Sequence, residues 1–582
     1  MKKLFFLGAL FAVGLGFTAC SSDDAVNAES NQQTGNEKGY VSLAISLPTN
    51  TSTTRGNNDV FDDGLADEYT VASTTLLFFN GTETTSTLVE SYTPSIAAWN
   101  KQGTSTDQIT TVAKLVQSVS SKANDLYLLV VLNAVDLPTL TNGSTTVADV
   151  LNATVNSSAA ITQGTMLMSN APLAVVAGGT SNPTSSEVVK LIKIAKENIY
   201  STEAEAKSNP AAEVYVERIA AKVTVNSKSG NTVNGTIPYV LDGWALDNYN
   251  TSASLVRSTE GFTSFYNYYS DKVATNEYRM IGGTAVGTNG KSGGDAVTYY
   301  RIYWAKDANY NTDATLTTTT SPTFKTTYGS ENPAYCFENT FDVAHQQVKN
   351  TTRVIMRLKF NDGEAFYTLG GDASKIYLLD TSTKAGTKIS TKLKEYLMNL
   401  TDVKTWLSTN TKEGETFGES DINSITIAAK SGSTTEYEVK GIEFSTTKLN
   451  AIPTSTNYSD WAKALNNAID GITYYTGGYS YYTVLIKHFG DELTPWAAAD
   501  HMTGGAYDDE DGAGKPISRY LGRYGVLRNN WYDISINKVQ QIGDAKVPTV
   551  SGDGTTDDVV KSYIAVKINI LSWAKRTQSV DL

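Results

Sequence analysis

The stretch that organises the chain reads Tyr40-Val-Ser-Leu-Ala-Ile-Ser-Leu47. Its large apolar side chains stand at every second position, and small side chains fill the positions between them. The apolar set is Val41, Leu43, Ile45 and Leu47. This period of two predicts a strand that buries one face. Pro48 follows, and because proline has no N–H to donate, the strand is expected to end there.

A polar tether follows this strand. Thr49 to Asn58 has no apolar face and contains one arginine, Arg55, which is the only arginine before Arg218. Flexible polar loops are easily cut by proteases. A core strand tied to the rest of the chain by such a tether, with one arginine in it, suggests that the strand is temporary. The alternative is that Arg55 is an ordinary loop residue.

The first residues have the pattern of an export signal. Lys2 and Lys3 precede the apolar run Leu4–Phe17, which ends at Thr18-Ala19-Cys20. We therefore predict a signal peptide over residues 1–19, since the run is too short to span a bilayer. The end of this run resembles a bacterial lipobox, which implies lipidation of Cys20; the alternative is an ordinary signal peptide with a chance cysteine.

Composition narrows the class of protein. At 582 residues the chain is too long for one core. Its net charge of −13 argues against nucleic acid as a partner. A low charged fraction of 18% with 33 tyrosines favours many short strands with polar outer faces, and hence a mainly β extracellular protein. After Cys20 only Cys336 remains, so the mature chain can form no intramolecular disulfide.

Local patterns predict further elements along the chain. The expected strands are 71–79, 126–132, 166–172 and 214–225. The expected helices are 111–122, from the spacing of its valines and leucine, then 144–155, 390–400 and 460–470. Ser459 is expected to cap the last helix and Gly471 to end it. A polar, acidic stretch at 201–210 suggests a domain boundary.

A second strand near the C-terminus repeats the opening pattern. In Tyr563–Leu571 the β-branched residues again stand at every second position, as Ile564, Val566, Ile568 and Ile570. The two strands could fill the same groove, and burying four such side chains is worth roughly 6–12 kcal/mol before ordering costs. The alternative is that this strand belongs to the sheet of its own domain.

Motifs for chemistry are weak. His345, His488 and His501 are widely spaced, so no metal site is expected. Ala285–Ser292 approaches a phosphate loop but lacks its first glycine. Aromatic clusters such as Tyr474–Tyr482 suit packed strands, with sugar stacking as the alternative. Whether the acidic loop Asp508–Asp511 binds calcium stays open. We therefore expect no cofactor and no enzymatic activity.

Several pieces in order resemble one known family. They are the lipobox, the Tyr40–Leu47 strand with Arg55, Tyr127–Asn133, Val216–Val223, Leu527–Asn537 and the tail Ile568–Leu582. Together they resemble a major fimbrial subunit (fimbrillin) of the Bacteroidales type V pilus family, closest to the short-fimbria type. The loops between these pieces do not match.

The resemblance implies two tandem transthyretin-like β-sandwiches, here at 56–210 and 211–557. It implies a lipidated propeptide at 20–55, whose first strand is removed by an extracellular trypsin-like protease that cuts after Arg55. The segment 558–582 would then donate its strand to the next subunit. Expected partners are identical subunits, fimbrial tip and anchor proteins, host or bacterial surface ligands, and the outer membrane before cleavage.

Two functions of different kinds follow. The first is a polymerising stalk subunit of a cell-surface fimbria that supports adhesion and biofilm formation. The second is a monomeric surface lipoprotein that acts as an adhesin or binds glycans and keeps its N-terminal segment. A secreted hydrolase is weaker, because no catalytic constellation stands out.

Overall fold

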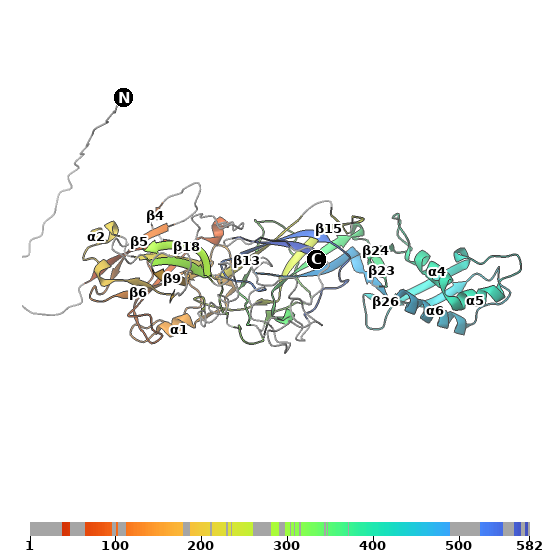
Figure 1. Cartoon of the computed structure of the whole chain (residues 1–582), viewed down its shortest axis with the longest axis horizontal. Helices are drawn as coiled ribbons and strands as arrows, with labels where there is room; N and C mark the ends of the chain where they lie inside the picture. The colour runs from red at the N-terminus through yellow and green to blue at the C-terminus, as the bar shows by residue number, and fades with distance from the viewer. Residues whose placement is uncertain are drawn as a thin grey trace, which may run out of the picture.

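The computed structural model is an elongated, mainly β molecule (Figure 1). It describes residues 38–46, 64–95, 100–102, 112–177, 187–209, 212–227, 231–233, 235–259, 281–289, 297–302, 304–307, 309–313, 316–319, 321–342, 345, 347–370, 372–488, 524–550, 564–571 and 577–579. One end holds an N-terminal sheet, the middle a second sheet, and the far end a unit in which helices cover a third sheet (Figure 1). The predicted mainly β architecture with a few helices is confirmed.

The N-terminal sheet has the strand order β3-β2-β6-β8-β12-β1-β5-β4, with β11 beside β6. Its strands are β1 (Gly39–Ser46), β2 (Thr74–Phe79), β3 (Leu88–Tyr92), β4 (Asn100–Gln102), β5 (Val112–Val119), β6 (Leu126–Leu132), β8 (Met168–Asn170), β11 (Ile192–Ile194) and β12 (Ala212–Arg218). The Glu90 carboxylate of β3 accepts the Ser120 N–H at 3.0 and 3.1 Å, just beyond β5. Strands from the two sides of the sheet therefore meet, and the sheet curls around an apolar core.

Two short helices accompany this sheet. α1 (Val147–Leu151) is capped by Thr146, whose hydroxyl accepts the Asp149 N–H, and α2 (Glu203–Ser208) is capped by Thr202 in the same way. β6 is buried on both faces, as its nearly all-apolar sequence predicts. One face meets the core that contains Leu43, and the other meets a second core around Leu77.

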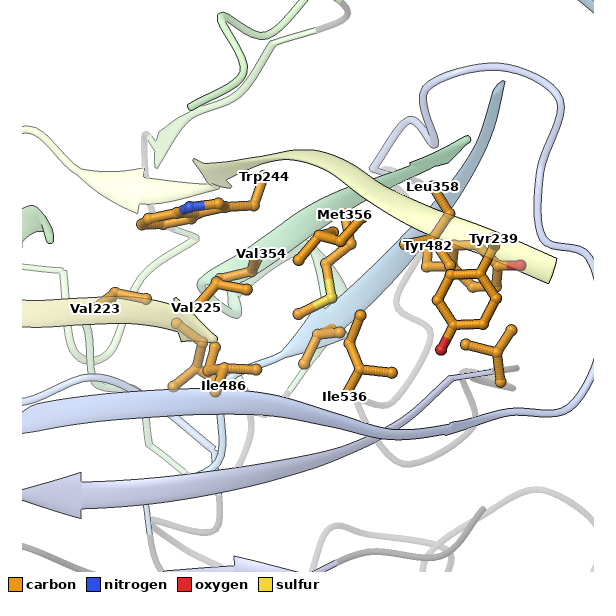
Figure 2. Packing of buried hydrophobic residues seen from close by; sticks show 14 of the residues in the cluster. Val223, Val225, Tyr239, Trp244, Val354, Met356, Leu358, Tyr482, Ile486 and Ile536 are labelled. Carbon is orange, nitrogen blue, oxygen red and sulfur yellow. The ribbon is translucent and has the colours of Figure 1, made fainter. Parts of the chain in front are cut away.

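The second sheet has the order β21-β13-β29-β14-β15-β22-β28, with the hairpin β30–β31 on the far side of β29. Its strands are β13 (Ala220–Asn226), β14 (Asn231–Val233), β15 (Ile237–Asp247), β21 (Ala334–Phe337), β22 (Arg353–Phe360), β28 (Tyr479–Leu485), β29 (Trp531–Val539), β30 (Ile564–Leu571) and β31 (Thr577–Ser579). Figure 2 shows Trp244, Met356 and Leu358 packing toward Val225 and Ile536 across its interior.

The two sheets are linked by segments that cross between them. β9 (Leu173–Ala177) pairs with β10 (Glu187–Val189) and with β19 (Val297–Ile302), which pairs with β18 (Ile281–Asn289). β17 (Ala253–Ser254) pairs with β7 (Thr154–Val155). A further small pair is β16 (Tyr249–Asn250) with β20 (Leu316–Thr317). Residues from the middle of the chain thus complete the N-terminal half, so the division at 210 and 211 and the transthyretin-like topology stay predictions.

The third unit was not anticipated. Its sheet, β24-β23-β27-β26-β25, is covered by helices that lie together at one end of the molecule (Figure 1). Its elements are β23 (Phe366–Leu369), β24 (Asp372–Leu378), α4 (Ile389–Asn399), α5 (Thr401–Asn410), β25 (Ile422–Ala429), β26 (Glu436–Phe444), α6 (Ser455–Ile469) and β27 (Ile472–Tyr475). Phe366 and Tyr475 stack at 4.6 Å between ring centroids, with both side chains in the core of the second sheet, which ties this unit to it.

Three local predictions are wrong. Within the predicted helix 111–122, Val112–Val119 form the strand β5, because the ladder with β1 outweighs a weak helical spacing of β-branched valines. The run 214–225 is two strands in different sheets, separated at Ile219. α6 begins earlier than expected, with Thr454 and not Ser459 as its cap. Its end is as predicted, since Asp470 (φ 52°) and Gly471 (φ 102°) turn the chain out of the helix.

Candidate functional site

β1 occupies a place inside the N-terminal sheet, between two other strands. It pairs antiparallel with β5 from Gly39 opposite Val119 to Ser46 opposite Val112. On its other side it pairs in parallel with β12 from Leu43 opposite Ala212 to Ser46 opposite Tyr215. We call the space between β5 and β12 the β1 slot. A strand held on both sides cannot leave without breaking two ladders.

The side chains expected on the buried face are buried. Val41 and Leu43 expose 0% of their surface and Ile45 exposes 2%. They belong to one core with Leu115, Leu128 and Val214. Three such side chains contribute about 5–9 kcal/mol of burial before ordering costs. Leu47 lies outside the described residues.

The N-terminal end of the β1 slot is closed by the stretch that precedes α2. Tyr40 N donates to Tyr200 O at 2.8 Å, and Tyr200 N donates back to Tyr40 O at 2.9 Å. Ile199 and Val119 flank Gly39 at this end and are 5% and 1% exposed. On this side β1 is therefore paired at Tyr40 with Tyr200 and from Leu43 to Ser46 with β12.

After the tether, the chain is attached to the rest of the fold at one buried carboxylate, that of Glu68. Leu65 N donates to the Glu68 carboxylate at 2.9 Å, and Lys222 of β13 makes an ion pair with it at 2.7 Å. Tyr335 donates to the same carboxylate at 2.5 Å. Glu68 and Lys222 are fully buried. These contacts fix the segment after the tether to the second sheet.

The predicted processing and lipidation residues cannot be placed. Cys20, Arg55 and Gly56 lie outside the described residues, as does the predicted signal peptide. Their roles stay predictions.

The second predicted strand lies in its own half of the molecule. β30 pairs antiparallel with β29, from Ile564 opposite Val539 to Leu571 opposite Trp531. β31 folds back on β30 through three positions. The structure therefore brings β1 and β30 to different sheets within one chain, and it describes the backbone but not the side chains of Ile564, Val566, Ile568 and Ile570.

Sequence reasoning missed a set of buried charges where the two halves meet. Arg257 makes two bonds to Glu217, at 2.7 and 2.8 Å, and Arg528 pairs with Glu338. Arg218 donates to Asn529 at 3.1 Å. The available signal was the presence of charged residues among buried apolar ones in two stretches, Val216–Val223 and Leu527–Asn537. These two family-like pieces are neighbours in space: Asn529 N donates to Ala220 O at 2.7 Å and Lys222 N to Asn530 O at 2.9 Å.

The residues considered for metal or ligand chemistry have structural surroundings. His345 contacts Asp342 at 2.6 Å and His488 is buried against Tyr532 at 2.8 Å, while His501 lies outside the described residues. Among the residues that the structure describes, no group of three potential ligands could hold a metal ion. Ala285 to Asn289 form part of β18, so they run as a strand. The Asp508–Asp511 loop lies outside the described part, and calcium there stays open.

The tyrosine cluster at 474–482 is mainly packing. Tyr475 stacks on Phe366 and donates to Gly543 O at 3.0 Å, and burial raises its pKa to about 12. Tyr482 is also buried and donates to Gln541 O at 2.9 Å. Within the described ranges, no helix combines the length and apolar character needed to cross a membrane.

The chain is thus a mainly β protein whose N-terminal strand lies between two other strands of its sheet. One comparison with known families gives a match, in the C-terminal part of the chain. Residues 473–579 match the family described as major fimbrial subunit protein type IV, fimbrillin, C-terminal. This match supports the resemblance to fimbrillins that the sequence predicts; the short-fimbria subtype stays a prediction.

Solved structures give more distant likenesses. A fimbrilin from Porphyromonas gingivalis is 12% identical with a TM-score of 0.33, over 93% of this chain and 99% of that one. The tip fimbrial protein of the same organism, truncated at its C-terminus, is 10% identical with a TM-score of 0.28, over 92% and 100%. A fimbrial assembly protein from Parabacteroides distasonis is 10% identical with a TM-score of 0.25, over 56% and 96%. TM-scores at this level do not establish a shared role, so the likeness to fimbrillins rests on the C-terminal match. No curated protein sequence matches the chain.

Proposed function

We propose that this protein is the stalk subunit of a cell-surface fimbria, exported as a lipoprotein on Cys20 and cut between Arg55 and Gly56 before it polymerises. The observation that carries the proposal is the position of β1, which is N-terminal in the chain yet interior in the sheet. One cut in the tether would break the covalent link between β1 and the rest of the folded chain, so β1 could leave once its two ladders open.

Loss of β1 would leave an empty slot with two unpaired strand edges and an exposed apolar floor. β5 and β12 would each lose a ladder partner, and the apolar core around Leu43 would open to water. Unpaired strand edges readily accept a strand from another chain. An apolar strand from a second subunit is the natural occupant, since it restores both the hydrogen bonds and the burial.

The C-terminal strand is the proposed donor. Its apolar residues Ile564, Val566, Ile568 and Ile570 repeat the spacing of β1. Within its own chain β30 sits outside β29, with only the short β31 beyond it. When β30 of one subunit enters the β1 slot of the next, it would exchange its contacts with β29 and β31 for ladders with β5 and β12. Burial of its apolar side chains in the slot would supply the driving force.

Cleavage would leave the rest of the fold anchored. The bonds of Glu68 to Lys222 and Tyr335 lie downstream of Arg55 and hold the new N-terminal segment to the second sheet. A subunit without β1 would therefore keep its two halves together. This suits a subunit that bears load along a filament.

The proposed assembly has several partners. Identical subunits would form the stalk, fimbrial tip and anchor proteins would end it, and an arginine-specific extracellular protease would trigger it. The filament would support adhesion to host or bacterial surfaces and biofilm formation, and the precursor would lie on the outer membrane through its lipid. The alternative is a monomeric surface adhesin or glycan-binding lipoprotein, which the pairing of β30 within its own chain favours.

The test is the N-terminus and assembly state of protein sheared from cells. We expect Gly56 as the first residue and a ladder of multimers on an unheated denaturing gel. Arg55→Ala should keep Cys20 and abolish the ladder, while the neighbouring control Asn57→Ala should not. Deleting 563–582 should leave export and cleavage intact and stop polymerisation. A monomer that starts at lipidated Cys20 would contradict the stalk function and support the monomeric adhesin.

A further inference from the structure

The alternation of apolar residues does not by itself define the register of a strand in the β1 slot. A shift by one residue turns the apolar face outward and is therefore costly. A shift by two residues keeps the same face inward. A strand with four apolar residues in alternation, such as Ile564–Ile570, could bind in several such registers unless the slot has a stop.

The structure contains such a stop at Gly39. A Cβ atom built on Gly39 would lie far inside the van der Waals distance of Ile199 Cγ2, and at 3.2 Å from Lys122 Cβ and 3.5 Å from Val119 Cγ2. Ile199 and Val119 are buried, so neither can turn into open solvent. The place of Gly39 thus admits backbone but almost no side chain.

The Ile199 side chain is also held by its backbone. Ile199 N donates to Lys196 O at 3.1 Å, and the next residue, Tyr200, exchanges two hydrogen bonds with Tyr40. The stop is therefore part of the slot wall, and an incoming strand would remake the two bonds to Tyr200 with its own backbone at the place of Tyr40. Two residues further along, Val41 is fully buried, so a large apolar side chain fits there.

We propose that Ile199 is a register stop that determines which residues of an incoming strand enter the β1 slot. The inference rests on the proposed strand exchange. The occupant must present a small side chain at the place of Gly39, where a large one is excluded, and its first large apolar residue at the place of Val41. The register is then set by two effects: Ile199 excludes a large side chain at the place of Gly39, and the apolar side chains are buried at the places of Val41, Leu43 and Ile45.

In either direction the C-terminal sequence places a serine at this position, so Ile199 would have to shift only enough to accommodate one small side chain. Ser562 precedes the apolar set Ile564–Ile570 by two positions, and Ser572 follows it by two. Moving the strand one step further in would push Ile564 or Ile570 against Ile199. Moving it one step out would place a serine at the apolar site of Val41 and lose burial.

The experiment uses labelled peptides of residues 559–574 and the full chain after cleavage at Arg55. Peptides carrying Ser562→Trp or Ser572→Trp are compared with the unchanged peptide by fluorescence anisotropy. We expect one of the two to bind about tenfold or more weakly, because an overpacked site forces its neighbours to move. The affected serine also reports the direction of the strand.

Subunits carrying Ile199→Ala provide the decisive comparison. The enlarged site should restore most of the lost binding of the affected peptide. A control, Ile452→Ala at an exposed position, should not. Circular dichroism of the uncleaved precursors checks that both variants fold.

The outcomes separate the two proposals. Equal binding of all three peptides, or a loss that Ile199→Ala does not relieve, overturns the register stop and leaves strand exchange standing. If the unchanged peptide does not bind the cleaved subunit, the donor role of the C-terminal strand fails instead.

Discussion

At the scale of single residues, burial decides what each side chain can do. Leu43 illustrates this for packing, since it is fully buried and lies in register with both Leu115 and Ala212. Cys336 illustrates it for chemistry, because a fully buried thiol is kept from water and from reagents.

Leu43→Ala is expected to lower the free energy of unfolding of the precursor by about 2–5 kcal/mol, since it leaves a cavity in a closed core. Chemical denaturation of the purified precursor measures this. Val240→Ala, at a residue that is 58% exposed, should change stability little. In filaments cut after Arg55 the Leu43 substitution should have no effect, and an equal effect there would contradict the removal of β1.

Cys336 is expected to be inert in the folded protein. Burial raises the pKa of its thiol to about 12, so the reactive thiolate is scarce at neutral pH. A disulfide reagent at pH 8 should label it only after guanidinium is added. Rapid labelling without denaturant would show that β21 opens readily.

At the scale of elements, the ends of α6 show how a local rule can select the wrong residue. The sequence offers two plausible hydroxyl caps, and the structure uses the earlier one. Thr454 accepts the Asn457 N–H at 3.2 Å, while the Asn457 side chain accepts the Thr454 N–H at 2.9 Å. Ser459 lies within the first turns of the helix.

Thr454→Ala is therefore expected to cost about 1 kcal/mol of stability, because it removes this reciprocal cap. Ser459→Ala is the matched control and should be neutral or slightly stabilising, because alanine favours a helix interior. Thermal denaturation of both variants distinguishes the positions. A larger loss for Ser459→Ala would place the start of α6 where the sequence alone suggested it.

At the scale of the whole molecule, buried ion pairs connect the halves. Lys222 lies over the Trp531 ring at 3.9 Å from its centroid and pairs with Glu68, so one side chain joins β13, β29 and the segment after the tether. Breaking a buried pair leaves an uncompensated charge, which costs more than the pair contributes.

Lys222→Met is expected to lower the free energy of unfolding by about 3–5 kcal/mol. Lys207→Met is the control, because the Lys207–Glu203 pair is exposed on both sides and exposed pairs contribute little. Calorimetry of the two variants and the parent measures the difference. Equal stability of the Lys222 and Lys207 variants would rule out the Lys222–Glu68 pair as an important link between the two halves.

The sequence by itself determined the features that depend on near neighbours. Alternation in Tyr40–Leu47 defined a strand with Val41, Leu43 and Ile45 inward, and Gly471 marked the end of α6. Only the tertiary structure decided that 112–119 is a strand, that β5 and β12 flank β1, and that Ile199 closes the slot at Gly39. The reason is physical: periodicity fixes which face of an element is apolar, whereas the choice of partner depends on contacts between residues tens to hundreds of positions apart, such as Glu217 with Arg257 and Glu338 with Arg528.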